Sequence, residues 1–118
     1  MHDVRSFRLS WPPTVNHRMS VNRRSGRMYT TGQYREWMAS NLKELGNQED
    51  TIKRPVMVDI GLEAPTRRRY DIDNRIKPIL DLLTKARVID DDSLVDRIEC
   101  HRMEPCKPGR ALVRVFEI

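Results

Sequence analysis

Apolar and polar residues first alternate at Phe7-Arg8-Leu9-Ser10-Trp11, a pattern typical of a half-buried β-strand. Pro12-Pro13 ends this strand, because proline lacks the backbone N–H that a sheet requires. Residues 14–29 are polar and rich in Arg, Asn and Ser, so we expect a long loop there. In compact domains, loops of that length are commonly either functional or disordered.

The next segment has the spacing of an amphipathic helix. Thr30 or Thr31 can cap a helix that begins near Gln33, and Gly46-Asn47 can end it. Its apolar residues recur at intervals of three and four, which places them on one face: Tyr34, Trp37, Met38, Leu42 and Leu45. Tyr34 and Trp37 could instead stack on nucleic-acid bases, but their helical spacing favours the core.

A second strand is predicted over Val56–Leu62, between Pro55 and Pro65, with its even-numbered apolar residues on one side. A second helix is predicted from about Asn74 to Ala86, with Asp73 or Asn74 as its N-cap. Its expected core residues are Ile76, Ile79, Leu80, Leu83 and Ala86. Because Pro78 has no N–H to donate, we expect it in the first turn, so the helix starts no earlier than about Asp73.

Two more strands, Leu94–Met103 and Ala111–Ile118, flank a turn-rich hairpin connection at residues 105–109. The predicted order is β-α-β-α-β-β, a small α+β single domain spanning residues 1–118, with a mixed sheet and both helices on one face. With 118 residues and 6% aromatic content, the core is lean, and dimerisation would add to it.

Charge changes this picture, because it is unevenly distributed. The chain has 22 Lys and Arg against 17 Asp and Glu, a net charge of +5. The excess lies in two blocks, residues 1–35 and residues 67–77, and such blocks can neutralise nucleic-acid phosphates. The alternative for the arginines of the first block is that they line a solvated loop: Arg18, Arg23, Arg24 and Arg27.

Several function classes are disfavoured. No apolar run approaches the length of a membrane span, and nothing near Met1 has the pattern of a secretion signal. Two cysteines cannot staple a secreted scaffold, so we expect a cytoplasmic protein. Cys100, His101 and Cys106 supply only three ligands at a spacing foreign to zinc sites, which favours strand packing for them.

The most informative segment is acidic and lies within the second basic block. Asp71 and Asp73 are two residues apart, which puts both carboxylates on one side if the chain is extended there. Asp90-Asp91-Asp92 follows about twenty residues later. The intervening helix spans roughly 18 Å, so the two acidic sites meet only if the later segment folds back along it.

Carboxylates within a basic surface suit a hard divalent ion such as Mg²⁺, which can support phosphodiester hydrolysis. Arg67 to Arg69 could then hold the nucleic-acid backbone, and Lys77 could stabilise charge on the phosphate. Structural roles are the alternative: Asp73 as a helix cap, Asp71 and Asp90-Asp91-Asp92 as turn residues, Lys77 paired with Asp81.

Several motifs in the same order carry a resemblance over nearly the whole chain. They are Trp11-Pro12-Pro13-Thr14-Val15-Asn16, Thr31-Gly32-Gln33-Tyr34-Arg35, Arg67-Arg68-Arg69-Tyr70-Asp71-Ile72-Asp73-Asn74, Lys77, Leu83-Thr84-Lys85-Ala86 and Asp91-Asp92-Ser93. The chain thereby resembles the RusA family of Holliday junction resolvases, small dimeric endonucleases of bacteria and their phages. It departs from the family at Arg87, where Gly is common, and at Asp90, an additional acidic residue.

The resemblance implies a homodimeric, Mg²⁺-dependent endodeoxyribonuclease, with Mn²⁺ as a possible substitute, that makes paired symmetric nicks in four-way DNA junctions. By position, Asp71, Asp73 and Asp92 would bind metal, Asp91 would be a further acidic position, and Lys77 would be catalytic. The expected DNA-binding residues are Arg18, Arg23, Arg24, Arg27, Arg67, Arg68, Arg69 and Arg75. Two other classes stay open: a non-catalytic DNA-binding protein, and a metal-dependent nuclease for other branched or single-stranded DNA.

Overall fold

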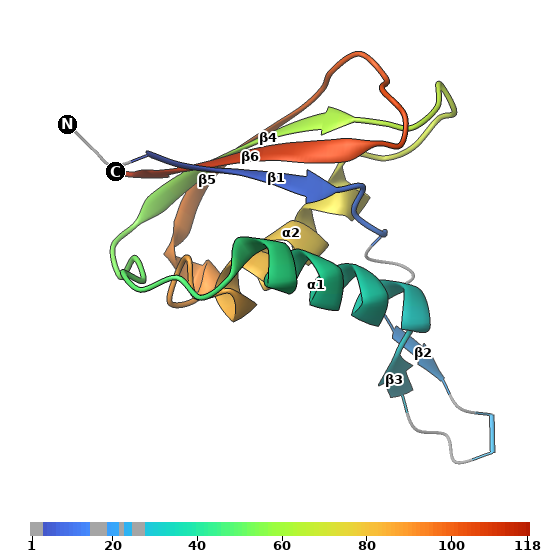
Figure 1. The fold of residues 1–118 in the computed structure, drawn as a ribbon, viewed down its shortest axis with the longest axis horizontal. Helices are drawn as coiled ribbons and strands as arrows, with labels where there is room; N and C mark the ends of the chain where they lie inside the picture. The colour runs from blue at the N-terminus through green and yellow to red at the C-terminus, as the bar shows by residue number, and fades with distance from the viewer. Residues whose placement is uncertain (1–3, 15–18, 22, 25–27) are drawn as a thin grey trace.

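The computed structural model describes residues 4–14, 19–21, 23–24 and 28–118. Its elements are β1 (Val4–Ser10), β2 (Met19–Val21), β3 (Met28–Thr30), α1 (Gly32–Leu45), β4 (Val56–Glu63), α2 (Asp73–Lys85), the 3₁₀ turn η2 (Asp92–Leu94), β5 (Val95–Arg102) and β6 (Arg110–Glu117). Four strands form a mixed sheet in the order β1-β6-β4-β5, and both helices cover the same face of it (Figure 1). The predicted α+β class is confirmed.

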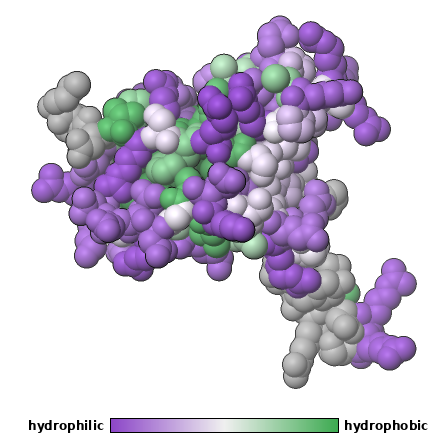
Figure 2. All heavy atoms as spheres, viewed as in Figure 1, coloured by the Kyte–Doolittle hydropathy of each residue, from purple (hydrophilic) through white to green (hydrophobic). Residues whose placement is uncertain are grey.

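Strand β4 is the centre of the sheet, antiparallel to β6 and parallel to β5. One side of β4 faces the helices and is fully buried, as the alternation predicts: Val56, Val58, Ile60 and Leu62. The opposite side carries the buried acids Asp59 and Glu63, which pair across the strand with Arg114 at 2.6 Å and Arg110 at 2.8 Å. On the face seen in Figure 2, hydrophilic residues predominate, and apolar residues are visible between them.

The predicted hairpin between the last two strands is wrong. β6 lies between β1 and β4, whereas β5 pairs only with the other edge of β4. The turn-rich residues 105–109 thus carry the chain across β4, because so apolar a strand needs a neighbour on both edges. The segment from β4 through α2 to β5 is a β-α-β unit, which parallel pairing requires.

The polar composition of residues 14–29 predicts a loop, but part of this segment is β-structure. Met19 pairs with Thr30 and Val21 with Met28, so β2 and β3 form a short antiparallel ribbon (Figure 1). Three-residue strands give too brief an alternation to be recognised in a polar segment. The first strand also differs from expectation, because it spans Val4–Ser10 and leaves Trp11 outside.

Helix α1 is anchored to the end of β1. Thr31 caps it by accepting a hydrogen bond from the Tyr34 N–H at 3.3 Å, and Tyr34, Trp37 and Met38 are buried, as predicted. Trp37 Nε1 also donates to the Ser10 carbonyl at 2.9 Å. None of the described helices is long and apolar enough to cross a membrane.

Asn41 is a buried polar residue that the helical pattern does not reveal. Its Oδ1 accepts from the Ser10 N–H at 3.1 Å, and its Nδ2 donates to Ser10 Oγ at 2.9 Å and to the Trp37 carbonyl at 2.8 Å. The side chain is 3% exposed, so these bonds replace its contacts with water. Asn41 thus fixes the point where β1 leaves the sheet.

Helix α2 begins without the predicted side-chain cap. Ile72 occupies the N-cap position in a helical conformation, and Asp73 is the first helical residue. Pro78 is the sixth residue and not in the first turn, and it is buried. A proline there removes one helical hydrogen bond.

Arg87 adopts the left-handed conformation that ends α2. Its φ is 62°, and its N–H bonds the Thr84 carbonyl at 3.1 Å while the Val88 N–H bonds the Leu83 carbonyl at 3.0 Å. This pair of bonds is a Schellman motif, whose left-handed position usually holds Gly. The departure from the family at Arg87 is therefore a side chain placed where the backbone favours glycine.

Replacing Arg87 by Gly should leave the protein about 1 kcal/mol more stable to unfolding than replacing it by Ala, because only Ala keeps the strained Cβ. Urea denaturation of both variants, followed by circular dichroism, measures the difference. Equal midpoints for the two variants would contradict it.

Candidate functional site

A stripe of charged residues runs along one face of α2. The stripe consists of residues four apart, whose side chains follow one another along the same face at intervals of about one helical turn: Asp73, Lys77 and Asp81. Their order is acid, base, acid. The stripe begins in the first turn of the helix, where a negative side chain is favoured by the helix dipole.

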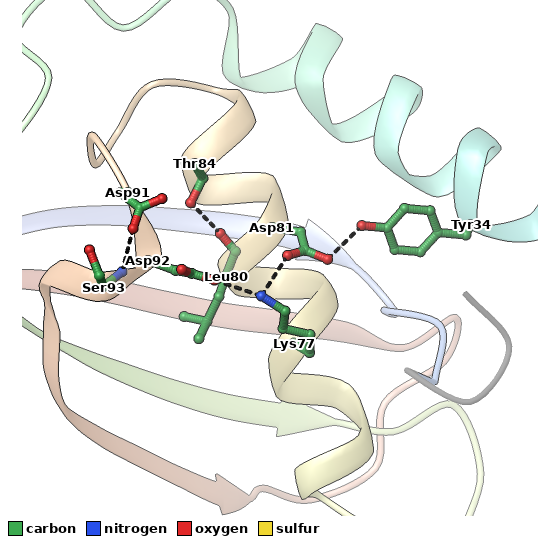
Figure 3. Close-up of polar contacts among 8 residues, drawn as sticks. All are labelled: Tyr34, Lys77, Leu80, Asp81, Thr84, Asp91, Asp92 and Ser93. Atoms are coloured by element: carbon green, nitrogen blue, oxygen red, sulfur yellow. Dashed lines mark hydrogen bonds and ion pairs between the residues drawn. The ribbon is translucent and has the colours of Figure 1, made fainter. Parts of the chain in front are cut away.

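Lys77 lies between two carboxylates (Figure 3). Its Nζ is 2.6 Å from Asp92 Oδ2 and 3.1 Å from Asp81 Oδ1. The hydrogen bond to Asp92, with a smaller contribution from Asp81, raises the pKa of the Lys77 ammonium above its ordinary value. The lysine is therefore held charged, and the contact with Asp92 shows that η2 does fold back along α2.

The three consecutive acids differ in direction. Asp92 points toward α2, whereas Asp91 Oδ2 accepts from the Ser93 N–H at 3.0 Å and so caps η2. The Ser93 side chain, and to a smaller extent its backbone N–H, lowers the pKa of the Asp91 carboxyl by hydrogen bonding to the carboxylate. Asp90 is exposed, and its backbone N–H bonds the Ile52 carbonyl at 3.0 Å. Of the three, Asp92 is the one that joins the stripe on α2.

Asp71 lies just before the start of α2 and has no contact with the Lys77–Asp92 pair among the described contacts. Its Oδ2 accepts from Asn74 Nδ2 at 3.5 Å, and Ile72 between the two acids has helical backbone angles. The extended geometry that would place Asp71 and Asp73 on one side is therefore not present. In the described part of the chain, no three or more His, Cys, Asp or Glu side chains are grouped closely enough to hold a metal ion.

The donor chemistry nevertheless fits a hard divalent cation, because every candidate ligand is a carboxylate. Asp73 precedes Lys77 by one helical turn on the same face of α2, and Asp92 contacts the Lys77 ammonium directly. In this arrangement the Lys77 ammonium neutralises the Asp92 carboxylate.

A cleft of about 1050 Å³ adjoins Asp71. It lies between the segment that follows β4 and the end of β5, and its lining includes Arg67, Arg68, Arg69 and Arg102. Arg67 pairs with Glu104 at 3.1 Å on the exposed rim. The predicted arginine cluster is thus next to an acid of the site, which suits a strand of DNA passing the carboxylates.

A stack of cations and aromatic rings holds this corner together. Arg75 lies 4.9 Å from the Trp11 ring, Trp11 packs edge-on against Tyr70 at 5.2 Å, and Arg102 lies 4.9 Å from the Tyr70 ring. Arg75 also donates to the Pro12 carbonyl, and Arg102 Nη2 donates to the Tyr70 carbonyl at 2.6 Å. The sequence does not reveal this stack, since its members come from three separate segments.

The remaining predicted residues are placed as follows. Arg23 and Arg24 lie exposed in the turn between β2 and β3, and Arg18 and Arg27 fall outside the described residues. Cys100 is half-buried against the core, as strand packing predicts, and Cys106 is exposed in the turn before β6. His101 Nδ1 lies 3.9 Å from Asp59 Oδ1 on the other face of the sheet.

Comparison with known proteins matches these features to one family. The family model described as endodeoxyribonuclease RusA matches residues 10–115. Crossover junction endodeoxyribonuclease RusA of Aquifex aeolicus is 32% identical over 86% of this chain and 81% of its own length. The Escherichia coli K12 protein of the same name is 33% identical over 96% of this chain and 94% of its own length.

The protein of that name from Enterobacteria phage 82 is 35% identical over 93% of this chain and 92% of its own length. The matched region runs from the last residue of β1 into β6 and includes the stripe on α2, the arginine cleft and η2. This chain belongs to the RusA family of endodeoxyribonucleases.

Proposed function

We propose that the protein is a Holliday junction resolvase, an endodeoxyribonuclease that cuts four-way DNA junctions with the help of Mg²⁺. The observation that carries the proposal is the approach of Asp92 to Lys77 on the face of α2 that begins with Asp73. Family membership and the arginine cleft beside Asp71 support a DNA phosphodiester as the substrate.

Asp71, Asp73 and Asp92 are the residues that would hold the ion, with Asp91 a further acid whose side chain caps η2. When bound, such an ion supplies an activated water and stabilises the oxygens of the scissile phosphate. Mn²⁺ would suit the same oxygen ligands. Asp73 is the first residue of α2, with Asp71 two residues before it, and Asp92 belongs to η2.

Lys77 is proposed to stabilise negative charge on the phosphate during cleavage. An ammonium has three N–H donors, and Asp81 and Asp92 account for two of the acceptors around Lys77. A third donor would reach a phosphate oxygen placed over the stripe. The ammonium is charged throughout the neutral range, and its raised pKa is in the direction that keeps it so.

The arginines are proposed to hold the DNA. Arg67, Arg68 and Arg69 line the cleft, while Arg23 and Arg24 project on the β2–β3 ribbon, where a junction arm could be contacted. Arg75 already stacks on Trp11, so its proposed effect on DNA is through the shape of this corner. A homodimer would supply two such sites to a two-fold substrate, in the cytoplasm of a bacterium.

Asp73→Asn should reduce the rate of junction cleavage by about 100-fold or more. Junction binding should stay the same or tighten, because the substitution removes a negative charge near the DNA phosphates. The assay is cleavage of a synthetic four-way junction with Mg²⁺ or with EDTA. Asp90→Asn is the matched control, because it also removes one exposed carboxylate, but from a residue outside the proposed ion site.

Paired nicks at symmetry-related positions, lost with EDTA and with Asp73→Asn, are the expected result. Tight binding with no cutting by the wild type under any metal would leave a DNA-binding protein. Cutting of forks or single strands in preference to junctions would indicate a nuclease of different specificity.

Lys77→Ala should bind Mg²⁺ more tightly than the wild type, by about fivefold, because a neighbouring positive charge that occupies Asp92 is removed. The same variant should cleave junctions about 10²- to 10³-fold more slowly. Calorimetric titration of the free protein measures the first effect and single-turnover cleavage the second. An unchanged Mg²⁺ affinity would show that Lys77 and the ion do not share Asp92.

Junction binding in EDTA should depend on salt through the arginine cleft. Arg68→Ala and Arg69→Ala should each lower the slope of log Kd against log salt by about one, as a phosphate contact is lost. Arg54→Ala removes an exposed arginine just before the opposite end of β4 and should leave the slope unchanged. Equal slopes for all three variants would place the DNA elsewhere.

A further inference from the structure

We propose that Asp81 is a positioning residue that holds the Lys77 ammonium in the site during cleavage, an inference that rests on the proposed function. Asp81 is bound on both of its carboxylate oxygens. Oδ1 lies 3.1 Å from Lys77 Nζ, and Oδ2 accepts a hydrogen bond from the Tyr34 hydroxyl at 2.8 Å (Figure 3).

The two carboxylates around Lys77 are not equivalent. Asp92 extends from η2 and is one of the proposed metal ligands, so an arriving cation would compete with Lys77 for its oxygens. Asp81 extends from the middle of α2 and is held by the Tyr34 hydroxyl on α1. Its side chain is also less exposed than that of Asp92, 19% against 35%. Asp81 is therefore the partner that Lys77 can keep when Asp92 turns to the ion.

Tyr34 gives this arrangement its rigidity. The ring is 6% exposed and lies within the core, so its hydroxyl can move little. It lies in the first turn of α1, just after the Thr31 cap, and reaches across to the middle of α2. A lysine on a flexible four-carbon stem gains a defined position from such an anchored acceptor.

Two other roles for Asp81 are open to test. It could be an ordinary helical ion pair, which contributes little at an exposed surface, or it could bind the metal itself. If Asp81 acts through Lys77, its removal has no further effect once Lys77 is absent. If Asp81 binds metal, its removal weakens metal binding whether or not Lys77 is present.

The experiment is a double-mutant cycle of Asp81→Asn and Lys77→Ala with two readouts, single-turnover junction cleavage and calorimetric Mg²⁺ binding to the free protein. In the wild-type background, Asp81→Asn should slow cleavage about 10- to 100-fold through misplacement of the ammonium. It should also weaken Mg²⁺ binding about threefold to fivefold, because Lys77 then pairs with Asp92 alone. In the Lys77→Ala background, Asp81→Asn should change neither quantity.

Further variants separate positioning from folding. Asp81→Glu keeps a carboxylate within reach of a lysine four residues earlier and should recover most of the cleavage rate. Tyr34→Phe removes only the hydroxyl and should slow cleavage in the same direction, less than Asp81→Asn. Glu44→Gln, which removes an exposed carboxylate from α1, is the charge control and should cleave like the wild type.

Each contrary result has a distinct meaning. A wild-type protein that does not cut junctions overturns the proposed function, and this inference with it. A wild type that cuts, with Asp81→Asn equally fast, overturns only the role of Asp81. Weaker Mg²⁺ binding by Asp81→Asn in the Lys77→Ala background makes Asp81 a metal ligand and also overturns the positioning role.

Discussion

Strand β4 can be accommodated only between two other strands, because it is buried at every position except the half-buried Met57 and its backbone needs hydrogen-bond partners on both edges. β6 satisfies one edge in an antiparallel direction, and β5 satisfies the other in a parallel direction. Parallel pairing forces a crossover, and α2 is that crossover. The burial of one strand therefore requires a crossover, and the chain places Asp71, the charged face of α2 and Asp92 one after another along it.

On that side of the sheet, charge is balanced locally. Lys77 lies between Asp81 and Asp92, and Asp73 lies one turn away. The arginines are separated from these acids, because they line the cleft or stack on Trp11 and Tyr70. The region proposed to bind both a cation and a polyanion is thus divided into an acidic stripe and a basic cleft, which meet near Asp71.

Periodicity was sufficient to predict the helices, the buried face of β4 and the α+β class, since each depends on a pattern several residues long. It was not sufficient for the position of β6, because strand order depends on which edges must be covered. The start of α2 was wrong by one residue, since Ile72 adopts helical angles without a capping side chain. For the site, Lys77 and Asp92 were predicted from the family pattern, whereas Asn41, Tyr70 and the Tyr34–Asp81 bond join segments distant in sequence.

The pairing of β4 with β5 contains an irregularity that bears on Asp92. Val56 is opposite Val95 and Met57 is opposite Arg97, so Asp96 is an extra residue without a counterpart on β4. Beyond it, β5 pairs with β4 in regular register from Arg97 to Arg102. Before it, only Val95 of β5 is paired with β4, and η2 with Asp92 precedes the strand. The bulge thus adds one residue between η2 and the regularly paired part of β5. The position of Asp92 beside α2 therefore depends on the length of the segment from the end of α2 to the paired part of β5, as well as on its sequence.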